Sequence, residues 1–299
     1  PAYGEFTKHG VTVAADALSD WNKVEQRYDE KRGLAKGRRL GCQACVQSDV
    51  VIDVPAESQV HQQVIRKDAS ARSVKMNPAT RLFYVEVGEP DMHEPSGDFE
   101  RVKTALKDQW GISDVELDFF QFNKLQKTLR KGNWAITVAI FKDHTATPPR
   151  IIEIWPGLYE KGLFGLAIDL GSTTIAAHLT DLKSGDVIKS AGLMNPQIRF
   201  GEDLMSRVSY SMMNPGGDKE MTIVVREAIN SLAEQLRTEA EIEKNSLVEV
   251  VFVCNPVMHH LLLGIDPVEL GQAPFALASS NSIAVSASNL GLETMNPSG

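Results

Sequence analysis

A short stretch in the second half of the chain combines residue types that can bind a phosphate and a metal ion. It runs Asp169-Leu-Gly-Ser-Thr-Thr174, an acid at the end of an apolar segment followed by a glycine and three hydroxyl residues. Glycine lets the backbone approach an anion, consecutive N–H groups can point at its oxygens, and a carboxylate can hold hydrated Mg²⁺. The stretch has neither the Gly-Lys-Ser/Thr of a P-loop nor the spacing of a dinucleotide fingerprint. A phosphate-binding turn and an ordinary hairpin turn fit these residues equally well.

Three cysteines and two adjacent histidines are the other residues that could do chemistry. Cys42 and Cys45 form a C-x-x-C pair, which allows a redox or zinc interpretation. Zinc is the weaker interpretation, because no second pair and no nearby histidine accompanies them. Cys254 follows an apolar run, which is typical of an inert core thiol. His259 and His260 would project about 100° apart on a helix, so we expect one buried and one surface histidine rather than a metal site.

The overall composition excludes several classes of protein. With 299 residues, 42% of them hydrophobic, the chain is long enough for two or more domains. A net charge of −8 without a basic stripe argues against nucleic acid as a partner. No apolar run approaches the roughly 20 residues that cross a bilayer, and no secretory leader is visible. Three cysteines are too few for a disulfide framework, so we expect a cytoplasmic protein with reduced thiols.

Composition shifts predict a small N-terminal unit and a linker. Residues 1–56 suit an α/β unit with a charged helix over 20–32 and a strand over 49–54. Residues 57–79 are polar and end at an Asn-Pro turn signal, as a linker would. The chain begins with proline and stops in a loop-like Asn-Pro-Ser-Gly, from which we expect it to be a fragment of a longer protein.

Two further α/β units are predicted after the linker. Residues 80–161 form an α+β unit with a helix opening at residue 96 and a segment over 117–129 that suits a strand or a helix. Its predicted strands are 82–87, 133–141 and 151–155. The last unit, 162–299, begins with a three-stranded meander that contains the Asp169 turn. It continues with predicted helices over 201–213 and 218–244, a strand over 248–253 and a short helix that Gly264 ends.

The order of strands, turn and helices in residues 162–299 resembles the actin-like ATPase superfamily. More narrowly, the whole chain resembles the reductive activators of corrinoid enzymes, metalloproteins with an N-terminal plant-type ferredoxin, a linker, a middle domain and a C-terminal actin-like ATPase domain. This resemblance implies a multi-domain α/β chain: the end of a ferredoxin (1–56), the middle domain (80–161) and the first part of the ATPase domain (162–299). The segments that carry the closer match are 39–43, 94–101, 133–139, 165–174, 200–207 and 258–267.

The resemblance implies a [2Fe–2S] cluster whose ligand set is incomplete in this sequence. Such a site uses C-x₄-C-x₂-C and a distant fourth cysteine. Cys42 matches the lone fourth ligand, and the clustered three would precede Pro1. Cys45 departs from the family pattern. We therefore expect that this chain by itself does not hold the cluster.

The resemblance also implies an ATP and Mg²⁺ site. Asp169, the implied catalytic residue, would hold the metal through water. The residues expected to contact phosphate are Gly171, Ser172, Thr173 and Thr174. Asp203 and Arg207 lie in a matching segment, and Asp203 is placed among the nucleotide-binding residues without a defined role for either. Asn255 would face the nucleotide cleft or, as the plainer interpretation, cap the helix that begins at Pro256.

The implied function is ATP-dependent reductive activation, in which an electron from the cluster returns a Co(II) corrinoid to Co(I). The implied partners are the corrinoid protein of a methyltransferase system and an upstream reductant, and the middle domain would serve homodimerisation or docking. Two alternatives remain open: a small-molecule kinase of the same superfamily, and an electron carrier whose turn no longer binds nucleotide. Activators of acyl-CoA dehydratases fit less well, because they hold a cluster with cysteines inside the ATPase domain, where Cys254 stands alone.

Overall fold

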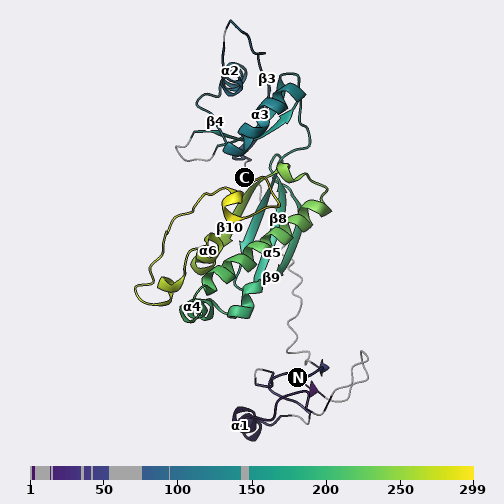
Figure 1. The fold of residues 1–299 in the computed structure, drawn as a ribbon, viewed down its shortest axis with the longest axis vertical. Helices are drawn as coiled ribbons and strands as arrows, with labels where there is room; N and C mark the ends of the chain where they lie inside the picture. The colour runs from purple at the N-terminus through teal and green to yellow at the C-terminus, as the bar shows by residue number, and fades with distance from the viewer. Residues whose placement is uncertain are drawn as a thin grey trace. The chain divides into compact units, whose positions relative to one another are not determined.

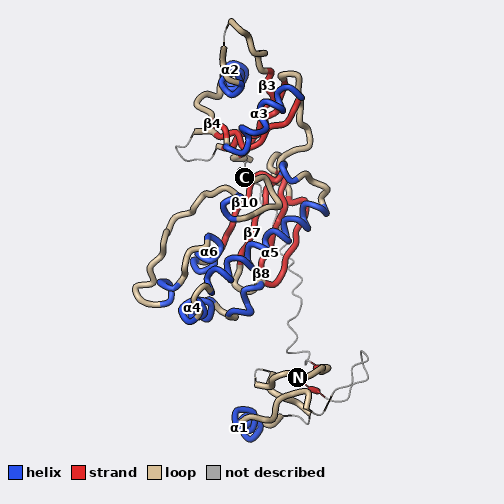
Figure 2. The backbone as a smooth tube through the Cα atoms, in the orientation of Figure 1, coloured by secondary structure: helices blue, strands red, loops and turns tan. Residues whose placement is uncertain are grey.

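The protein is a mixed α/β chain with two four-stranded mixed sheets (Figures 1 and 2). Backbone contacts divide it into two compact units, Pro1–Val64 and Ile65–Gly299. None of the helices in the described part of the chain is both long and apolar enough to cross a membrane. The computed structural model describes residues 2–3, 14, 16–34, 37–41, 43–53, 76–93, 95–142 and 148–299.

The N-terminal unit contains helix α1 (Lys23–Arg32) and a short antiparallel ladder of β1 (Ala2–Tyr3) with β2 (Ile52–Asp53). Helix α1 begins after the N-cap Asn22, whose side chain accepts hydrogen bonds from the first turn, and the Glu25 carboxylate accepts one from the Asn22 backbone amide. This capping box fixes the start of the helix. The predicted start at residue 20 is therefore wrong, because the cap lies at Asn22.

A buried ion pair anchors the backbone just before Cys42, which itself lies outside the described residues. Arg39 Nε and Nη2 donate to the two carboxylate oxygens of Glu25 at 2.8 and 2.6 Å. The Leu40 amide donates to Glu25 Oε1 at 3.1 Å. These bonds, that of Arg39 above all, hold the pKa of the Glu25 carboxyl below its ordinary value.

Replacing Glu25 by glutamine is expected to destabilise the N-terminal unit by about 3 kcal/mol, because it removes one partner of a buried pair. The lowered pKa also makes the stability of this unit pH-dependent. The contribution of Glu25 is complete at neutral pH and is lost as the pH falls below about 4. Amide exchange of α1 between pH 3 and 7 measures both effects. Glu30→Gln, an exposed change on the same helix, is the control, and equal protection in both variants would contradict the prediction.

The first four-stranded sheet and its two helices surround a core of their own. The strand order is β3-β5-β6-β4, antiparallel except for the β4–β6 pair. Helices α2 and α3 contribute buried leucines to the same apolar cluster as β5 and β6. The elements are β3 (Thr80–Glu86), α2 (Asp98–Trp110), β4 (Glu116–Leu117), α3 (Phe119–Lys131), β5 (Ala135–Phe141) and β6 (Arg150–Pro156).

Two details of this unit differ from the pattern in the sequence. The ambiguous segment 117–129 is mostly helix, because Asp118 caps α3 by accepting a hydrogen bond from the Phe120 amide. The strand predicted from residue 133 begins at Ala135. Asn133 and Trp134 have φ values of 49° and 66°, a left-handed conformation that cannot continue a strand.

The second sheet has the order β10-β7-β8-β9. Its first three strands in sequence are an antiparallel meander, as predicted, and β10 runs parallel to β7. Cys254 pairs with Leu170, so β7 and β10 end at the same edge of the sheet. The strands are β7 (Phe164–Leu170), β8 (Thr174–Asp181), β9 (Val187–Met194) and β10 (Leu247–Cys254).

Helices cover one face of this sheet. The predicted helix over 201–213 begins only at Leu204, because Asp203 is its N-cap, and the helix predicted to residue 244 ends at Glu239. Gly264 ends α6 in a left-handed conformation with φ 76°, as predicted. The α-helices are α4 (Leu204–Met213), α5 (Gly217–Glu239) and α6 (Pro256–Leu263). The short 3₁₀ helices are η3 (Pro196–Phe200), η4 (Lys244–Ser246), η5 (Val268–Gly271) and η6 (Ala287–Leu290).

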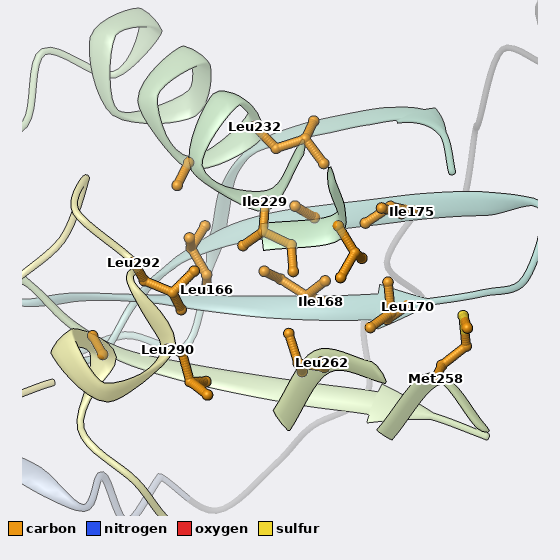
Figure 3. Close-up of a cluster of buried hydrophobic side chains, with 14 of the residues drawn as sticks. Leu166, Ile168, Leu170, Ile175, Ile229, Leu232, Met258, Leu262, Leu290 and Leu292 are labelled. Carbon is orange, nitrogen blue, oxygen red and sulfur yellow. The ribbon is translucent and has the colours of Figure 1, made fainter. Parts of the chain in front are cut away.

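The core between sheet and helices sets the direction of the site residues. Leu166, Ile168 and Leu170 of β7 point toward α5 and α6, where they meet Ile229 and Met258 among others (Figure 3). Successive side chains of a strand alternate between faces. The residues between these three, including Asp169, therefore lie on the opposite face of the sheet.

The end of the chain lies where the two sheets of the second unit meet (Figure 1). Asn296 Nδ2 donates to Glu153 Oε2 at 2.8 Å, and Ser298 Oγ bonds to Asp118 Oδ1 at 2.7 Å. A small apolar cluster of Ala139, Ile152, Leu163 and Val248 joins the sheets beside these bonds.

Candidate functional site

The turn between β7 and β8 is tight and requires glycine at its first position. The Gly171 amide donates to the Thr174 carbonyl at 3.0 Å, which closes the turn. A Cβ on Gly171 would lie 2.7 Å from that same carbonyl oxygen. Any side chain there would push the two strand ends apart. The sequence predicts that glycine permits a close approach of the backbone to an anion. In the structure, the close approach that requires glycine is that of Gly171 to the Thr174 carbonyl within the hairpin.

All three carbonyls of this turn are held by one neighbouring segment. Asn195 Nδ2 donates to the Gly171 carbonyl at 2.8 Å, and the Asn195 amide donates to the Thr173 carbonyl at 2.8 Å. Arg207 Nη2 donates to the Ser172 carbonyl between them. Asn195 and Arg207 are both buried, with exposed fractions of 1% and 0%. The turn is thus fixed from its core side.

Holding the carbonyls also directs the amides. In a trans peptide the C=O of one residue points opposite to the N–H of the next, and the only cis bond in the described chain precedes Pro274. Each of the amides of Ser172, Thr173 and Thr174 therefore points away from the donor that holds the carbonyl before it. Successive N–H groups at such a turn can line a concave anion site.

Asp169 lies beside these amides on the face of the sheet that α5 and α6 leave uncovered. It pairs with Ala176 on β8 and with Val253 on β10, and Val253 is 68% exposed. The Asp169 side chain is half-buried. A carboxylate next to the amides of a tight turn at the end of β7 can hold a phosphate together with a hydrated divalent cation.

Arg207 is a buried cation in a polar cage. Its Nε donates to the Gly201 carbonyl at 3.0 Å, and its Nη1 donates to Gln197 Oε1 at 3.3 Å and to Met258 Sδ at 3.2 Å. Burial lowers the pKa of the Arg207 guanidinium to about 10, so that it stays charged at neutral pH. The sequence placed Arg207 in a matching segment without a role, and it missed Asn195. The available signal was the Asn195-Pro196 pair, a start sequence for a helical turn.

Asp203 lies on the other side of Arg207 and caps α4. Its Oδ1 accepts a hydrogen bond from the Ser206 amide at 2.7 Å, and this bond lowers the pKa of the Asp203 carboxyl. The side chain is exposed. A role for Asp203 in nucleotide binding stays a prediction.

Asn255 follows β10 at the sheet edge where β7 ends. Its Oδ1 accepts from the Met258 amide at 3.0 Å, so the side chain is the N-cap of α6, as the plainer interpretation had it. The pairing of Cys254 with Leu170 brings Asn255 next to Gly171 along the edge. A contact of Asn255 with nucleotide stays a prediction.

Cys254, His259 and His260 lie near the turn, and at least one of them, His260, is held by hydrogen bonds to the backbone. Burial, together with the Asp169 carboxylate, raises the pKa of the Cys254 thiol. His260 is buried: its Nδ1 lies 2.8 Å from the Pro256 carbonyl, and its Nε2 accepts from the Ala278 amide at 3.1 Å. His259 is half-buried. Its burial, and to a lesser degree the charge of the neighbouring His260, lower the pKa of His259. His260 is buried, as expected, whereas His259 is half-buried rather than on the surface.

A groove of about 330 Å³ lies along the outer edge of β10. Its lining residues are Phe252, Val253, Cys254, Pro256, His259, Leu277 and 279–282.

The described residues do not supply a metal cluster. Among them, no three His, Cys, Asp or Glu side chains gather to hold a metal ion. Cys45 is an exposed free thiol whose amide donates to Ser19 Oγ at 3.0 Å. A [2Fe–2S] cluster needs four ligands, and Cys42 with Cys45 are the only cysteines in residues 1–56. These residues alone do not fit a complete cluster site.

Comparison with known proteins identifies the family of this two-sheet arrangement. Residues 69–161 match the family description "RACo linker region", and residues 164–299 match "RACo middle region". A solved "Reductive activator for corrinoid, iron-sulfur protein" superposes with a TM-score of 0.67 at 30% identity, over 88% of this chain and 43% of that protein. The "Corrinoid activation enzyme RamQ" of Eubacterium limosum is 32% identical over 127 residues, 42% of this chain and 21% of the relative.

The chain belongs to the RACo family, of which it contains the linker and middle regions. It spans about two fifths of the solved relative and about a fifth of the curated one.

Proposed function

We propose that the whole protein uses ATP to drive the reduction of a corrinoid protein from Co(II) to Co(I), and that the turn after β7 binds the phosphates of the nucleotide. The observation that supports this most is that Asn195 and Arg207 hold all three carbonyls of the turn that follows Asp169, which fixes the peptide groups whose amides can meet an anion. Membership of the RACo family supplies the corrinoid partner.

The residues of the turn fit Mg·ATP as follows. The amides and hydroxyls of residues 172–174 would contact phosphate oxygens, Gly171 would let the backbone of the turn approach them, and Asp169 would hold Mg²⁺ through water. Bound Mg²⁺ supplies charge neutralisation during phosphoryl transfer to water, and the protein's task is mainly to position the reactants. Asn255 completes the edge of the site, and Asp203 remains a candidate contact. In this proposal residues 162–299 are the first part of an actin-like ATPase domain.

ATP is needed because the Co(II)/Co(I) couple lies at a very low potential. A ferredoxin-type electron does not reach it unaided, so the free energy of ATP must shift the equilibrium. We assign the electron supply to a [2Fe–2S] cluster of the whole protein, with Cys42 as its one ligand in this chain and an upstream reductant behind it. We assign residues 1–56 to the ferredoxin and residues 80–161 to homodimerisation or docking of the corrinoid protein, in the cytoplasm.

The test is anaerobic titration of the whole protein with Mg·ATP while Co(I) formation is followed by absorbance. Asp169→Ala is expected to lower the ATP-dependent rate about 100-fold or more, because it removes the carboxylate that holds the metal. Asp186→Ala, at the exposed far end of the same meander, is the matched control and should be unchanged. Reduction that needs no ATP would indicate a plain electron carrier. Phosphorylation of a small molecule without reduction would indicate a kinase.

A further inference from the structure

Arg207 connects the hairpin turn, α6 and the segment before α4 that contains η3 and Gly201. It lies on the inner face of α4, and its three nitrogen atoms reach the hairpin turn, the Gly201 loop, η3 and α6. Of these contacts, the one to Ser172 spans 35 residues of sequence. The other acceptors of Arg207 lie in η3, at Gly201 and in α6, which pack around the turn. Arg207 therefore ties the Ser172 carbonyl of the turn to these surrounding elements.

Burying the Arg207 charge costs more free energy than a residue with a purely structural role would need to cost. Within the described chain no carboxylate lies at ion-pair distance from Arg207, and its charge is compensated by two carbonyls, an amide oxygen and a thioether sulfur. A buried charge without an ionic partner is expensive, and apolar residues of similar volume often replace such groups without loss of stability. A requirement for a fixed, charge-assisted bond to the Ser172 carbonyl explains why arginine stands here.

The backbone at Gly201 is shaped for the same contact. A Cβ on Gly201 would lie 2.8 Å from the Arg207 amide nitrogen and 2.7 Å from Ser206 Cβ. Because Gly201 has φ 168°, its backbone is extended and unstrained, so glycine is required by space rather than by conformation. The missing side chain lets the Gly201 carbonyl lie 3.0 Å from Arg207 Nε.

We propose that Arg207 is a positioning residue for phosphate binding: by holding the Ser172 carbonyl it aims the Thr173 amide at the phosphate of the bound nucleotide. This inference rests on the proposed function. Arg207 itself contacts no ligand, since its side chain is fully buried behind the turn. Lysine cannot take its place, because a single ammonium group does not reach the acceptors that the three guanidinium nitrogens bind in different directions.

Three variants of the whole protein test this role. Arg207→Lys keeps the positive charge and removes the several hydrogen bonds that the guanidinium donates. Gly201→Ala leaves the Arg207 side chain unchanged but displaces the start of α4 that carries it. The matched control is Arg226→Lys. Arg226 is half-buried in the same unit, and its Nε donates to the Leu262 carbonyl at 2.9 Å. The readouts are the dissociation constants of Mg·ATP and of adenosine, and the hydrogen exchange of the Gly171 and Asn195 amides, both of which bond within the turn.

The expected result is a loss of Mg·ATP affinity of about tenfold or more in Arg207→Lys and Gly201→Ala, because one charge-assisted bond no longer fixes the turn. Adenosine affinity should be unchanged, the two amides should exchange faster, and Arg226→Lys should match the wild type. Wild-type Mg·ATP affinity in Arg207→Lys, or an equal loss for ATP and adenosine, overturns the positioning role while the proposed function stands. A wild-type protein that binds no Mg·ATP overturns both.

Discussion

Replacing Asn195 by alanine is expected to lower the free energy of unfolding of the second unit by about 2–4 kcal/mol and to weaken Mg·ATP binding at the same time. The side chain is 1% exposed and has two tasks. Its Nδ2 donates to the Gly171 carbonyl at 2.8 Å, and its Oδ1 accepts from the Gln197 amide at 2.9 Å. Alanine removes both bonds, together with the contact of Nδ2 with Met258 Sδ at 3.6 Å, and leaves the half-buried Gly171 carbonyl and the buried Gln197 amide without these partners.

Two companion variants separate these tasks. Asn195→Asp keeps the acceptor for the Gln197 amide but has no donor for the Gly171 carbonyl, which then faces a carboxylate. We expect it to lose nucleotide affinity to the same extent as the alanine variant. Asn214→Ala, at the exposed end of α4, is the control and should change stability by no more than about 0.5 kcal/mol. Urea unfolding and ATP titration give both quantities, and an aspartate variant that binds ATP as the wild type does would contradict the prediction.

The meander around Asp169 could be predicted from the sequence because its signals are local. Alternating apolar residues mark β7 and β8, and a glycine with small polar residues marks the turn between them. The same local signals placed Gly264 at the end of α6 and identified Asn255 as a possible cap. Membership of the RACo family was likewise predicted from short segments distributed along the chain.

The residues that hold the turn could not be predicted, because their contacts are not local. Asn195 reaches the turn across 24 residues and Arg207 across 35. An arginine in a helix is expected to face solvent, so the pattern of α4 gives no sign that Arg207 lies inside. Only the packing of η3 and α4 against the hairpin brings these side chains together. The roles of Asp169, Asp203 and Asn255 toward a ligand remain predictions.

Helix and strand ends were predicted less well where a cap or a left-handed residue decides them. The helix expected from residue 201 starts after the Asp203 cap, and the strand expected from residue 133 starts after Asn133 and Trp134. In both cases the apolar pattern extends past the physical boundary. Periodicity records which face is buried, whereas the boundary depends on backbone angles and single hydrogen bonds.

Glu153 is expected to be the most sensitive single charge in the second unit. It is 1% exposed, it accepts hydrogen bonds from Lys124 Nζ at 2.7 and 2.8 Å, and Asn296 Nδ2 donates to it at 2.8 Å. Replacing it by alanine leaves the buried Asn296 amide group without that acceptor and removes the partner of Lys124. The expected cost is about 2–3 kcal/mol, the range for a hydrogen bond to a charged group whose partner is left buried, because Lys124 is 36% exposed and its ammonium stays in contact with water.

Besides the loss of stability, we expect Glu153→Ala to loosen the junction between the two sheets. Asn296 lies in the segment that joins the two sheets, and its backbone amide donates to the Leu247 carbonyl at the start of β10. Glu153→Ala should therefore speed hydrogen exchange of the Asn296 and Ser298 amides more than that of α5, because the junction loosens before the core opens. Glu160→Ala, an exposed change nearby, is the control. Uniform exchange changes in both segments would show instead that Glu153 acts only on the stability of the unit as a whole.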